Sequence, residues 1–157
     1  MASPRLFCTF RLAGGLFGVD LLDVKEITAE TTTTRVAHAP DEVLGLVNIR
    51  GHIYLALDLR RLLGLPASGV AAESRLVLFK PSVGAAFGVM VDEIADIQAA
   101  DPGLIDPFSR ADLPGDGPGA VRVELIESVI RLADELLVVL APRRFLPVVE
   151  RALAGPA

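Results

Sequence analysis

Few side chains in this sequence have the types and spacing that metal binding or nucleophilic catalysis requires. The chain contains two histidines, His38 and His52, and a single cysteine, Cys8. Neither histidine has a second histidine or a cysteine at the short spacing of metal ligands, so we expect no metal site and no cofactor. Cys8 lies in an apolar run, where a lone cysteine is typically a small buried side chain of a protein from a reducing compartment.

The acidic residues form no recognisable catalytic pair. An aspartic protease needs two carboxylates that share a proton, and its Asp-Thr-Gly or Asp-Ser-Gly signature is absent. Asp92 and Glu93 are adjacent, which is more typical of a solvated face than of an acid and a base. The glycine-rich segment 115–119 lacks the lysine and the following helix of a phosphate-binding loop, and it predicts a flexible linker. We therefore predict no catalytic residue and no enzyme activity; an enzyme with a site assembled from dispersed Asp and Glu is the disfavoured alternative.

Arg50 indicates a different kind of site. With Gly51 it forms a charged corner between two apolar strand candidates in residues 44–63. A buried unpaired charge is far costlier than a buried aliphatic side chain, so the guanidinium must be solvated or paired. We predict that Arg50 lies on the surface and is held by rigid neighbours. Because packing does not explain its charge, it is the strongest candidate for a binding residue.

The composition favours one compact, ordered protein. The chain has 157 residues, of which 52% are hydrophobic and 22% are charged. Its net charge is −5 and it has no Trp, so neither a basic groove nor an aromatic platform for nucleic acid is visible. No apolar run approaches the roughly 18 residues of a membrane span, and the first residues lack a secretory pattern. We expect a cytoplasmic protein with no direct membrane insertion and no nucleic acid partner.

Short alternating or apolar runs predict strands along most of the chain. The expected strands cover residues 6–12, 16–20, 44–49, 52–57, 75–80, 85–91, 125–132 and 135–140. Ala13-Gly14-Gly15 predicts a hairpin turn after the first strand, because the Gly-Gly pair can supply the positive φ that a tight turn needs. Asp58 and Gly64 are placed to cap a short helix, and a second helix is expected over residues 142–154. Residues 99–120 are rich in proline and glycine, and the pattern assigns them no element.

The two halves of the chain resemble each other. Residues 17–27 and 87–97 share Phe-Gly-Val and a terminal Ile without a gap, and the segment 49–63 is echoed at 130–146. Two echoes in the same order favour a duplication. We therefore expect one domain over residues 1–157, with a first lobe at 6–64, a linker at 65–74 and a second lobe at 75–146. Each lobe would be a small barrel of five short strands, because closure removes unpaired strand edges.

Three motifs together resemble the CheW family of chemotaxis coupling proteins. The first is Phe-X-Val-Asp at 17–20 followed by Val-X-Glu-Ile at 24–27, and the second is Gly-Leu-Val-Asn-Ile-Arg-Gly at 45–51 with Asp-Leu-Arg at 58–60. The third is the Phe-Gly-Val segment at 87–97. The similarity runs from about residue 6 to residue 146. The Asn-Ile-Arg-Gly segment is the most specific of these motifs.

The resemblance implies two SH3-like β-barrel lobes and a scaffold role without catalysis. In this family the cytoplasmic tip of a chemoreceptor docks between the lobes, and the partner kinase is the histidine kinase CheA, whose regulatory domain has the same fold. The receptor-binding candidates that match the family motifs are Val24, Glu26, Gly45, Asn48, Arg50, Gly88, Ile94 and Ile97.

Most of these candidates also have a structural interpretation. Val24, Ile94 and Ile97 are equally explained as core residues, and the two glycines as requirements of the backbone. Glu26 could simply solvate a strand. No motif fixes the residues that would contact the kinase.

Two residues and the proline-rich loop at 101–119 depart from the family pattern. His52 and Tyr54 place polar atoms in a strand that is usually aliphatic in this family. The expected function is an adaptor that couples chemoreceptors to CheA and is recruited to receptor arrays at the membrane. The departures leave open a scaffold of a pili-linked or other non-flagellar chemosensory pathway.

Overall fold

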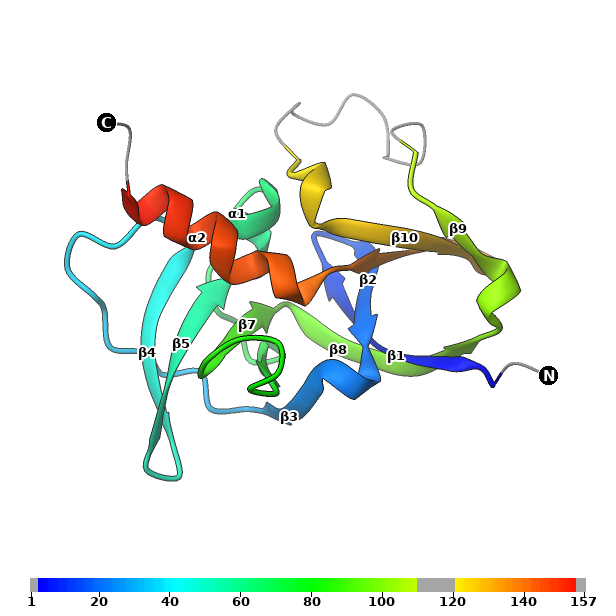
Figure 1. Cartoon of the computed structure of the whole chain (residues 1–157). Coiled ribbons are helices and arrows are strands. Elements are labelled where there is room, and N and C mark those ends of the chain that lie inside the picture. The colour runs from blue at the N-terminus through cyan, green and yellow to red at the C-terminus, as the bar shows by residue number, and fades with distance from the viewer. Residues whose placement is uncertain (1–2, 110–120, 155–157) are drawn as a thin grey trace.

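The computed structural model describes residues 3–109 and 121–154, and β-strands are its main elements (Figure 1). The strands form a six-stranded sheet, called sheet A, and a five-stranded sheet, called sheet B. Each sheet contains antiparallel neighbours and one parallel pair. The prediction of an all-β fold with short helices is confirmed, although sheet A has one strand more than expected.

Sheet A has the strand order β8-β1-β2-β11-β10-β9, and sheet B has the order β3-β6-β7-β5-β4. The strands of sheet A are β1 (Arg5–Leu12), β2 (Gly15–Asp20), β8 (Glu93–Ala100), β9 (Ile105–Pro107), β10 (Ile126–Arg131) and β11 (Leu136–Leu140). The strands of sheet B are β3 (Val24–Thr28), β4 (Val43–Ile49), β5 (His52–Asp58), β6 (Arg75–Phe79) and β7 (Phe87–Val91). Two α-helices, α1 (Leu59–Leu63) and α2 (Phe145–Ala154), and the 3-10 turns η1 (Leu21–Asp23), η2 (Pro102–Leu104), η4 (Val123–Leu125) and η5 (Pro142–Arg144) complete the described elements.

The two sheets share one topology and exchange strands between the halves of the chain. In sheet B, the hairpin β6–β7 runs beside the hairpin β4–β5 through the parallel pair β7 and β5, and β3 flanks β6. In sheet A, the hairpin β1–β2 meets β10–β11 through the parallel pair β2 and β11, and β8 flanks β1. Each sheet therefore takes one hairpin from each half.

The expected lobes at 6–64 and 75–146 are not the two sheets, because each sheet contains strands from both of these segments. The similarity between residues 17–27 and 87–97 matches equivalent strands, because β2 and β7 occupy the same place in their sheets. Sequence similarity shows which segments are alike but carries no information on which segments pair. Residues 65–74 do connect α1 to β6 without strand or helix.

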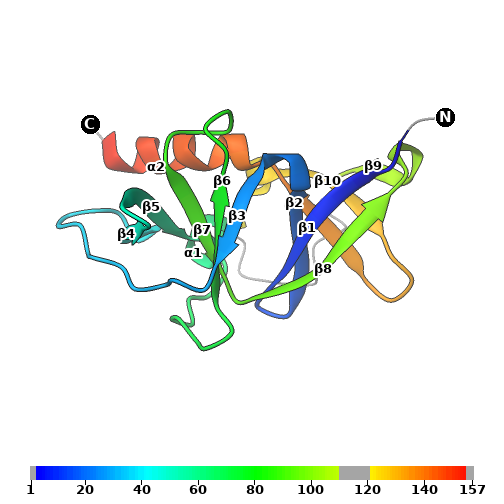
Figure 2. The same cartoon turned by 90° about the horizontal axis from the view of Figure 1, so that it is seen from below.

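Each sheet is closed by a segment that crosses from one edge to the other. After β3, the chain reaches the far edge of sheet B, where Thr34 and Leu46 exchange two backbone hydrogen bonds of 2.8 Å. After β8, the chain likewise reaches β9, which pairs with β10 at the far edge of sheet A. The sheets curl accordingly (Figures 1 and 2). This closure leaves fewer exposed strand edges, as in a barrel.

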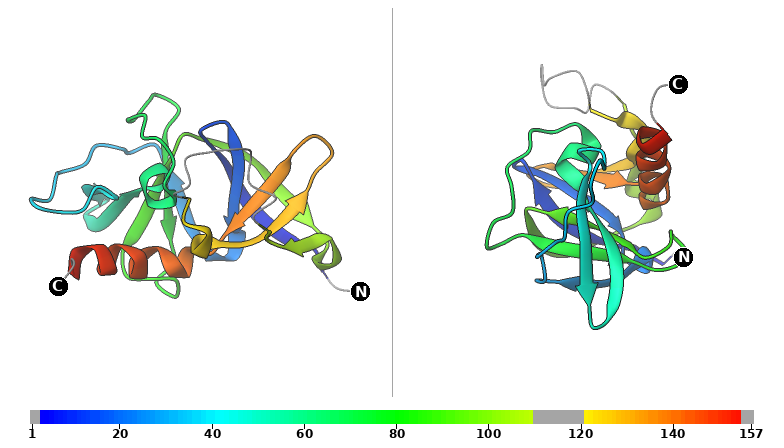
Figure 3. Two further views of the ribbon diagram at one scale, coloured as in Figure 1. Left: turned by 90° about the horizontal axis from the view of Figure 1, so that it is seen from above. Right: turned by 90° about the vertical axis from the view of Figure 1, so that its left-hand side faces the viewer.

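The main core lies between the two sheets and joins them to both helices. It contains buried residues from β1, β6, β7 and β11 together with Leu62 and Leu63 of α1 and Phe145 and Val149 of α2. A second cluster fills sheet B and a third fills sheet A. Figure 3 shows that α2 lies along sheet B and begins where the two sheets meet. The main core therefore contacts both sheets and both helices.

The predicted first hairpin and the predicted caps of α1 are found, but the turn is Ala13-Gly14 rather than Gly14-Gly15, and Gly15 is the first residue of β2. Ala13 and Gly14 have φ values of 50° and 84°, which a two-residue turn of type I′ requires at both positions. Asp58 accepts a hydrogen bond from the N–H of Arg61 at 3.4 Å and caps the start of α1. Gly64 ends the helix with a φ of 90°.

The segment 99–120 is partly regular. β8 extends to Ala100, and η2 and β9 follow within residues 102–107. The glycine-rich stretch 115–119, expected to be a linker, lies outside the described residues.

Asp92 connects the hairpin β1–β2 to α1 across the junction of the sheets. Its carboxylate accepts hydrogen bonds from Arg60, one of them from Nε at 2.8 Å, and from the backbone N–H of Ala13 at 2.9 Å. Partial burial alone would raise the pKa of Asp92, but the hydrogen bonds from Arg60 and Ala13 outweigh burial and lower that pKa below its usual value.

The stabilisation from Asp92 should therefore disappear in acid. Because the folded-state pKa lies below the unfolded-state value, the contribution is complete above about pH 4 and is lost as the pH falls through the folded-state pKa. We expect Asp92→Asn to lower the free energy of unfolding by about 1 kcal/mol at pH 7, a value reduced for solvent screening. Urea titrations between pH 7 and pH 2.5 measure this difference, which should shrink at the acidic end. Asp96→Asn, at an exposed position of β8, is the control, and a difference that does not depend on pH would contradict the assignment.

Candidate functional site

Arg50 occupies a tight turn that normally favours other residues. Arg50 and Gly51 connect β4 to β5 with φ values of 52° and 85°, again the type I′ geometry. For a residue other than glycine or asparagine, this left-handed region raises the conformational free energy by roughly 1 kcal/mol. The side-chain oxygen of Asn48 accepts a hydrogen bond from the N–H of Gly51 at 2.8 Å and holds the turn. The prediction that Arg50 is a surface residue with rigid neighbours is confirmed, since its side chain is 70% exposed.

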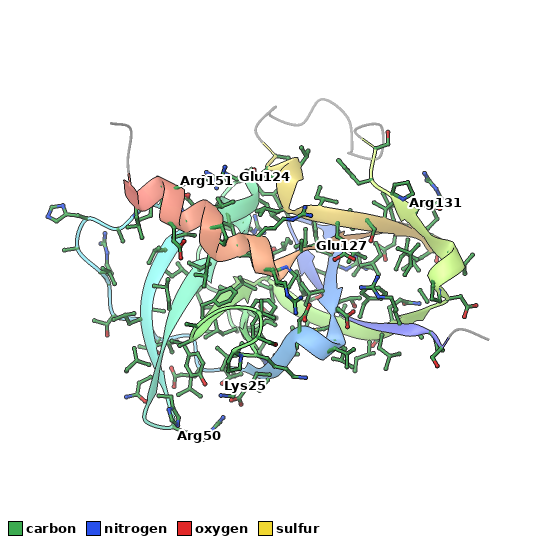
Figure 4. The ribbon with its side chains drawn as sticks, in the orientation of Figure 1. Lys25, Arg50, Glu124, Glu127, Arg131 and Arg151 are labelled. Carbon is green, nitrogen blue, oxygen red and sulfur yellow. The ribbon has the colours of Figure 1, made fainter. Side chains whose placement is uncertain are left out.

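Two side-chain contacts join this hairpin to β3 on the opposite edge of sheet B. The guanidinium of Arg50 donates a hydrogen bond to the carboxylate of Glu26 and forms an ion pair with it. Lys25 donates a hydrogen bond from Nζ to the hydroxyl of Tyr54 at 2.8 Å, and its Nζ lies 5.4 Å from the centroid of the Tyr54 ring. Figure 4 shows Lys25 and Arg50 at the same end of the molecule. We call Lys25, Glu26, Arg50 and Tyr54 the β3–hairpin cluster.

Half of this cluster is visible in the sequence motifs. Glu26 and Arg50 were both candidates, although their pairing was not predicted. The contact between Lys25 and Tyr54 was missed, and the available signal was the polar Tyr54 in an otherwise apolar strand. A bulge in β3 between Val24 and Glu26 adds Lys25 to the strand and changes the direction of the side chains that follow.

The two candidate glycines are required by the backbone around them. A side chain on Gly45 would overlap the carbonyl oxygen of Thr34, and Gly45 has a φ of 147°. A Cβ atom on Gly88, in the buried strand β7, would lie 2.6 Å from the carbonyl oxygen of Val77. Both residues are buried. These glycines can therefore influence a partner only by maintaining the backbone conformation, not by touching the partner.

The three apolar candidates are distributed over both sheets. Val24 and Ile94 are partly buried against the main core, from β3 and β8 respectively. Ile97 is 61% exposed on β8, opposite Cys8 of β1. Figure 2 shows β3 and β8 on one side of the molecule with β1 between them. The structure therefore brings Glu26, Asn48 and Arg50 to one hairpin end and leaves Ile97 on the other sheet.

An open hollow of about 440 Å³ lies elsewhere, beside the connector 65–74. Its arginines are already engaged: Arg60 with Asp92, and Arg11 with Glu135 through two hydrogen bonds of 2.6 and 2.8 Å. The hydrogen bonds from Arg11 lower the pKa of the Glu135 carboxyl. Within residues 3–109 and 121–154, no three His, Cys, Asp or Glu residues are grouped so that they could hold a metal ion. Across the same residues, no helix has both the length and the apolar character needed to cross a bilayer.

Two curled mixed sheets with a shared core and a charged hairpin end define a two-lobed β protein whose candidate site is a surface. The family model for the CheW-like domain matches residues 6–150, and the chain belongs to this family. The resemblance inferred from the sequence motifs is thereby confirmed.

Curated relatives agree with this assignment. The chain is 31% identical over 102 residues to the chemotaxis protein CheW of Klebsiella aerogenes, a match that covers 64% of this chain and 60% of the relative. It is 28% identical over 103 residues to the probable chemotaxis protein CheW of Rhizobium etli, with 66% of each chain covered. The chain thus spans less than two thirds of the length of these relatives.

A solved structure has the same fold. The crystal structure of the scaffolding protein TtCheW from Thermoanaerobacter tengcongensis matches with a TM-score of 0.74 at 24% sequence identity. The match covers 87% of this chain and 88% of that chain.

Proposed function

We propose that this protein is a non-catalytic adaptor that couples methyl-accepting chemoreceptors to the histidine kinase CheA in bacterial chemotaxis. Its membership of the CheW-like family supports the signalling context. The observation that carries the proposal is Arg50, an exposed cation in an unfavourable backbone conformation, whose side chain is paired with Glu26 and whose turn is held by Asn48 through the N–H of Gly51. Folding alone would be better served there by asparagine or glycine. A binding role explains the arginine.

The proposed mechanism is recognition without chemistry. The helical tip of a receptor would place apolar side chains between the sheets, near the exposed Ile97, while Arg50 and Asn48 contact its polar residues. Val24 and Ile94 would shape this surface from beneath. Gly45 and Gly88 would act only by maintaining the backbone.

The proposed second partner is the regulatory domain of a CheA-type kinase, bound through the ends of the lobes. The main core supports this role, because it joins the two sheets and a rigid body can transmit a shift at one surface to another. The proposal also places the protein in the cytoplasm, recruited to receptor arrays at the membrane. A pili-linked or other non-flagellar pathway is the alternative that His52 and Tyr54 leave open.

A reconstitution assay tests the function as a whole. Receptor fragments and the kinase from the same genome are mixed with and without this protein, and kinase autophosphorylation is measured. The protein should form a three-component complex on pulldown and raise the phosphorylation rate. If neither partner is retained, the adaptor role is wrong.

Arg50→Glu should weaken binding of the receptor fragment. We expect the dissociation constant to rise at least about tenfold, equivalent to roughly 1.4 kcal/mol, because the charge is reversed beside Glu26. Calorimetry measures the binding, while circular dichroism and the melting temperature report the fold. Arg50→Asn is a second variant that removes the guanidinium and keeps a residue suited to the turn.

Arg151→Glu is a matched control. Arg151 is 66% exposed and pairs with Glu124 at 3.1 Å, much as Arg50 pairs with Glu26, but it lies on α2 at the other end of sheet B (Figure 4). This variant should bind as the wild type does. Normal binding by both Arg50 variants would remove Arg50 from the interface, and unfolding of Arg50→Asn would make its role structural.

A further inference from the structure

Lys25 is a cation with a fixed position and no described carboxylate partner. Among the described residues, its ammonium group contacts the hydroxyl and the ring of Tyr54, and no ion pair to an acidic residue is found for it. An ammonium group has three donors, and Tyr54 uses one of them. The side chain of Lys25 is exposed, so its other donors are available to a ligand. Tyr54 is only 6% exposed and is held within the core of sheet B.

The acidic side chains nearest to Lys25 in sequence are paired with arginines, in a chain that is acidic as a whole. The sequence has only two lysines, Lys25 and Lys80, and its net charge is −5. Lys80 directly follows β6, and its backbone N–H donates to the carbonyl oxygen of Asp23, two residues before Lys25. The carboxylate of Asp23 is itself paired with Arg143 at 3.3 Å. The backbone of Lys80 therefore lies beside the start of β3, and the nearby Asp23 is engaged by Arg143 rather than by Lys25.

The acidic neighbours limit what that ligand can be. Glu26 is adjacent to Lys25 and is already neutralised by Arg50. A polyanion such as a nucleic acid or a phospholipid surface would meet Glu26 and Asp23 as well as the lysines. A single carboxylate needs only the ammonium group and avoids this repulsion.

We propose that Lys25, positioned by Tyr54, binds a carboxylate side chain of the partner that docks at the β3–hairpin cluster. The partner is then a helical hairpin with an Asp or Glu residue facing β3. This inference rests on the proposed function and adds the chemistry of one contact in the interface. Tyr54 acts as a positioning residue, because it holds the ammonium group and need not touch the partner.

A charge exchange tests the contact with the receptor-tip fragment from the same genome. Lys25→Glu should raise the dissociation constant about tenfold or more, and Lys25→Met should raise it less, because methionine keeps the apolar stem without a charge. The acidic residues of the fragment are then changed to lysine one at a time. One of these changes should restore binding to Lys25→Glu while weakening binding to the wild type. Lys80→Glu is the matched control and should show no such rescue.

The role of Tyr54 is tested by a double-mutant cycle. Tyr54→Phe keeps the ring and removes the hydroxyl, so it should weaken binding about two- to threefold without lowering the melting temperature. Combined with Lys25→Met, it should add nothing further. Additive effects would show that Tyr54 does not act through Lys25.

The outcomes separate this inference from the proposed function. If the fragment fails to bind the wild type, the proposed function fails. If the fragment binds the wild type and Lys25→Glu equally, or no acidic residue of the fragment gives rescue, the carboxylate contact is overturned and the adaptor role stands.

Discussion

Gly45→Ala should destabilise the protein by about 3 kcal/mol or more, one of the largest effects expected for so small a change. Two costs combine at this position. Gly45 has a φ of 147°, a region that side-chain-bearing residues rarely adopt, and an added methyl group would overlap the carbonyl oxygen of Thr34. That carbonyl accepts the hydrogen bond from Leu46 that closes sheet B. The clash can be relieved only by moving the closing segment.

Gly51→Ala separates the two costs. Gly51 also has a positive φ, of 85°, but nothing lies within 4 Å of the position its methyl group would take. Its replacement should cost about 1 kcal/mol, from backbone conformation alone. Urea denaturation of both variants gives the comparison. Equal losses would mean that the segment around Thr34 moves aside at little cost.

Phe145→Ala should cost about 3–5 kcal/mol, the usual range for deleting a buried ring. Phe145 is fully buried at the first position of α2, and its ring packs edge-on against Phe79 with centroids 6.0 Å apart. Phe79 in turn stacks on Phe87 at 5.1 Å. Because these rings come from α2, β6 and β7, the cavity would open where α2 enters the core between the sheets.

Leu153→Ala on the same helix is the control. Leu153 is 58% exposed, so its truncation should change the free energy of unfolding by less than about 0.5 kcal/mol. Chemical denaturation followed by circular dichroism measures both variants. A similarly small loss for Phe145→Ala would show that α2 is not anchored through this ring.

The sequence predicted best those features that a few adjacent residues determine. A positive φ at Gly14 and at Gly64, and a capping oxygen on Asp58, are local requirements, and each was found where expected. Arg50 was assigned to the surface by an equally local argument about the cost of burying its charge. Alternating polarity marked strands with one buried face, such as β4, and continuous apolar runs marked the buried strands β6 and β7.

Pairing between distant strands could not be predicted in this way. Alternation shows which face of β2 is buried but not that its parallel neighbour is β11, more than a hundred residues later. The same limit hid the contact between Lys25 and Tyr54, because β3 and β5 are not neighbours in sheet B and meet only when the sheet curls. The structural requirement at Gly45 was also hidden, since it comes from the approach of Thr34.

The exchange of hairpins between the sheets has a consequence for how this chain could have arisen. Each half supplies a hairpin that completes the sheet of the other half, which is the connectivity of a domain-swapped dimer. The connector between the two halves is exposed at residues 66–73, so it links them without being part of either sheet. An ancestral half-length chain would have had an incomplete sheet and an unpaired hairpin, and a second copy would have satisfied both. Fusion at the connector would make the second copy permanent and would allow the halves to differ, and Asn-Ile-Arg-Gly occurs in only one of them.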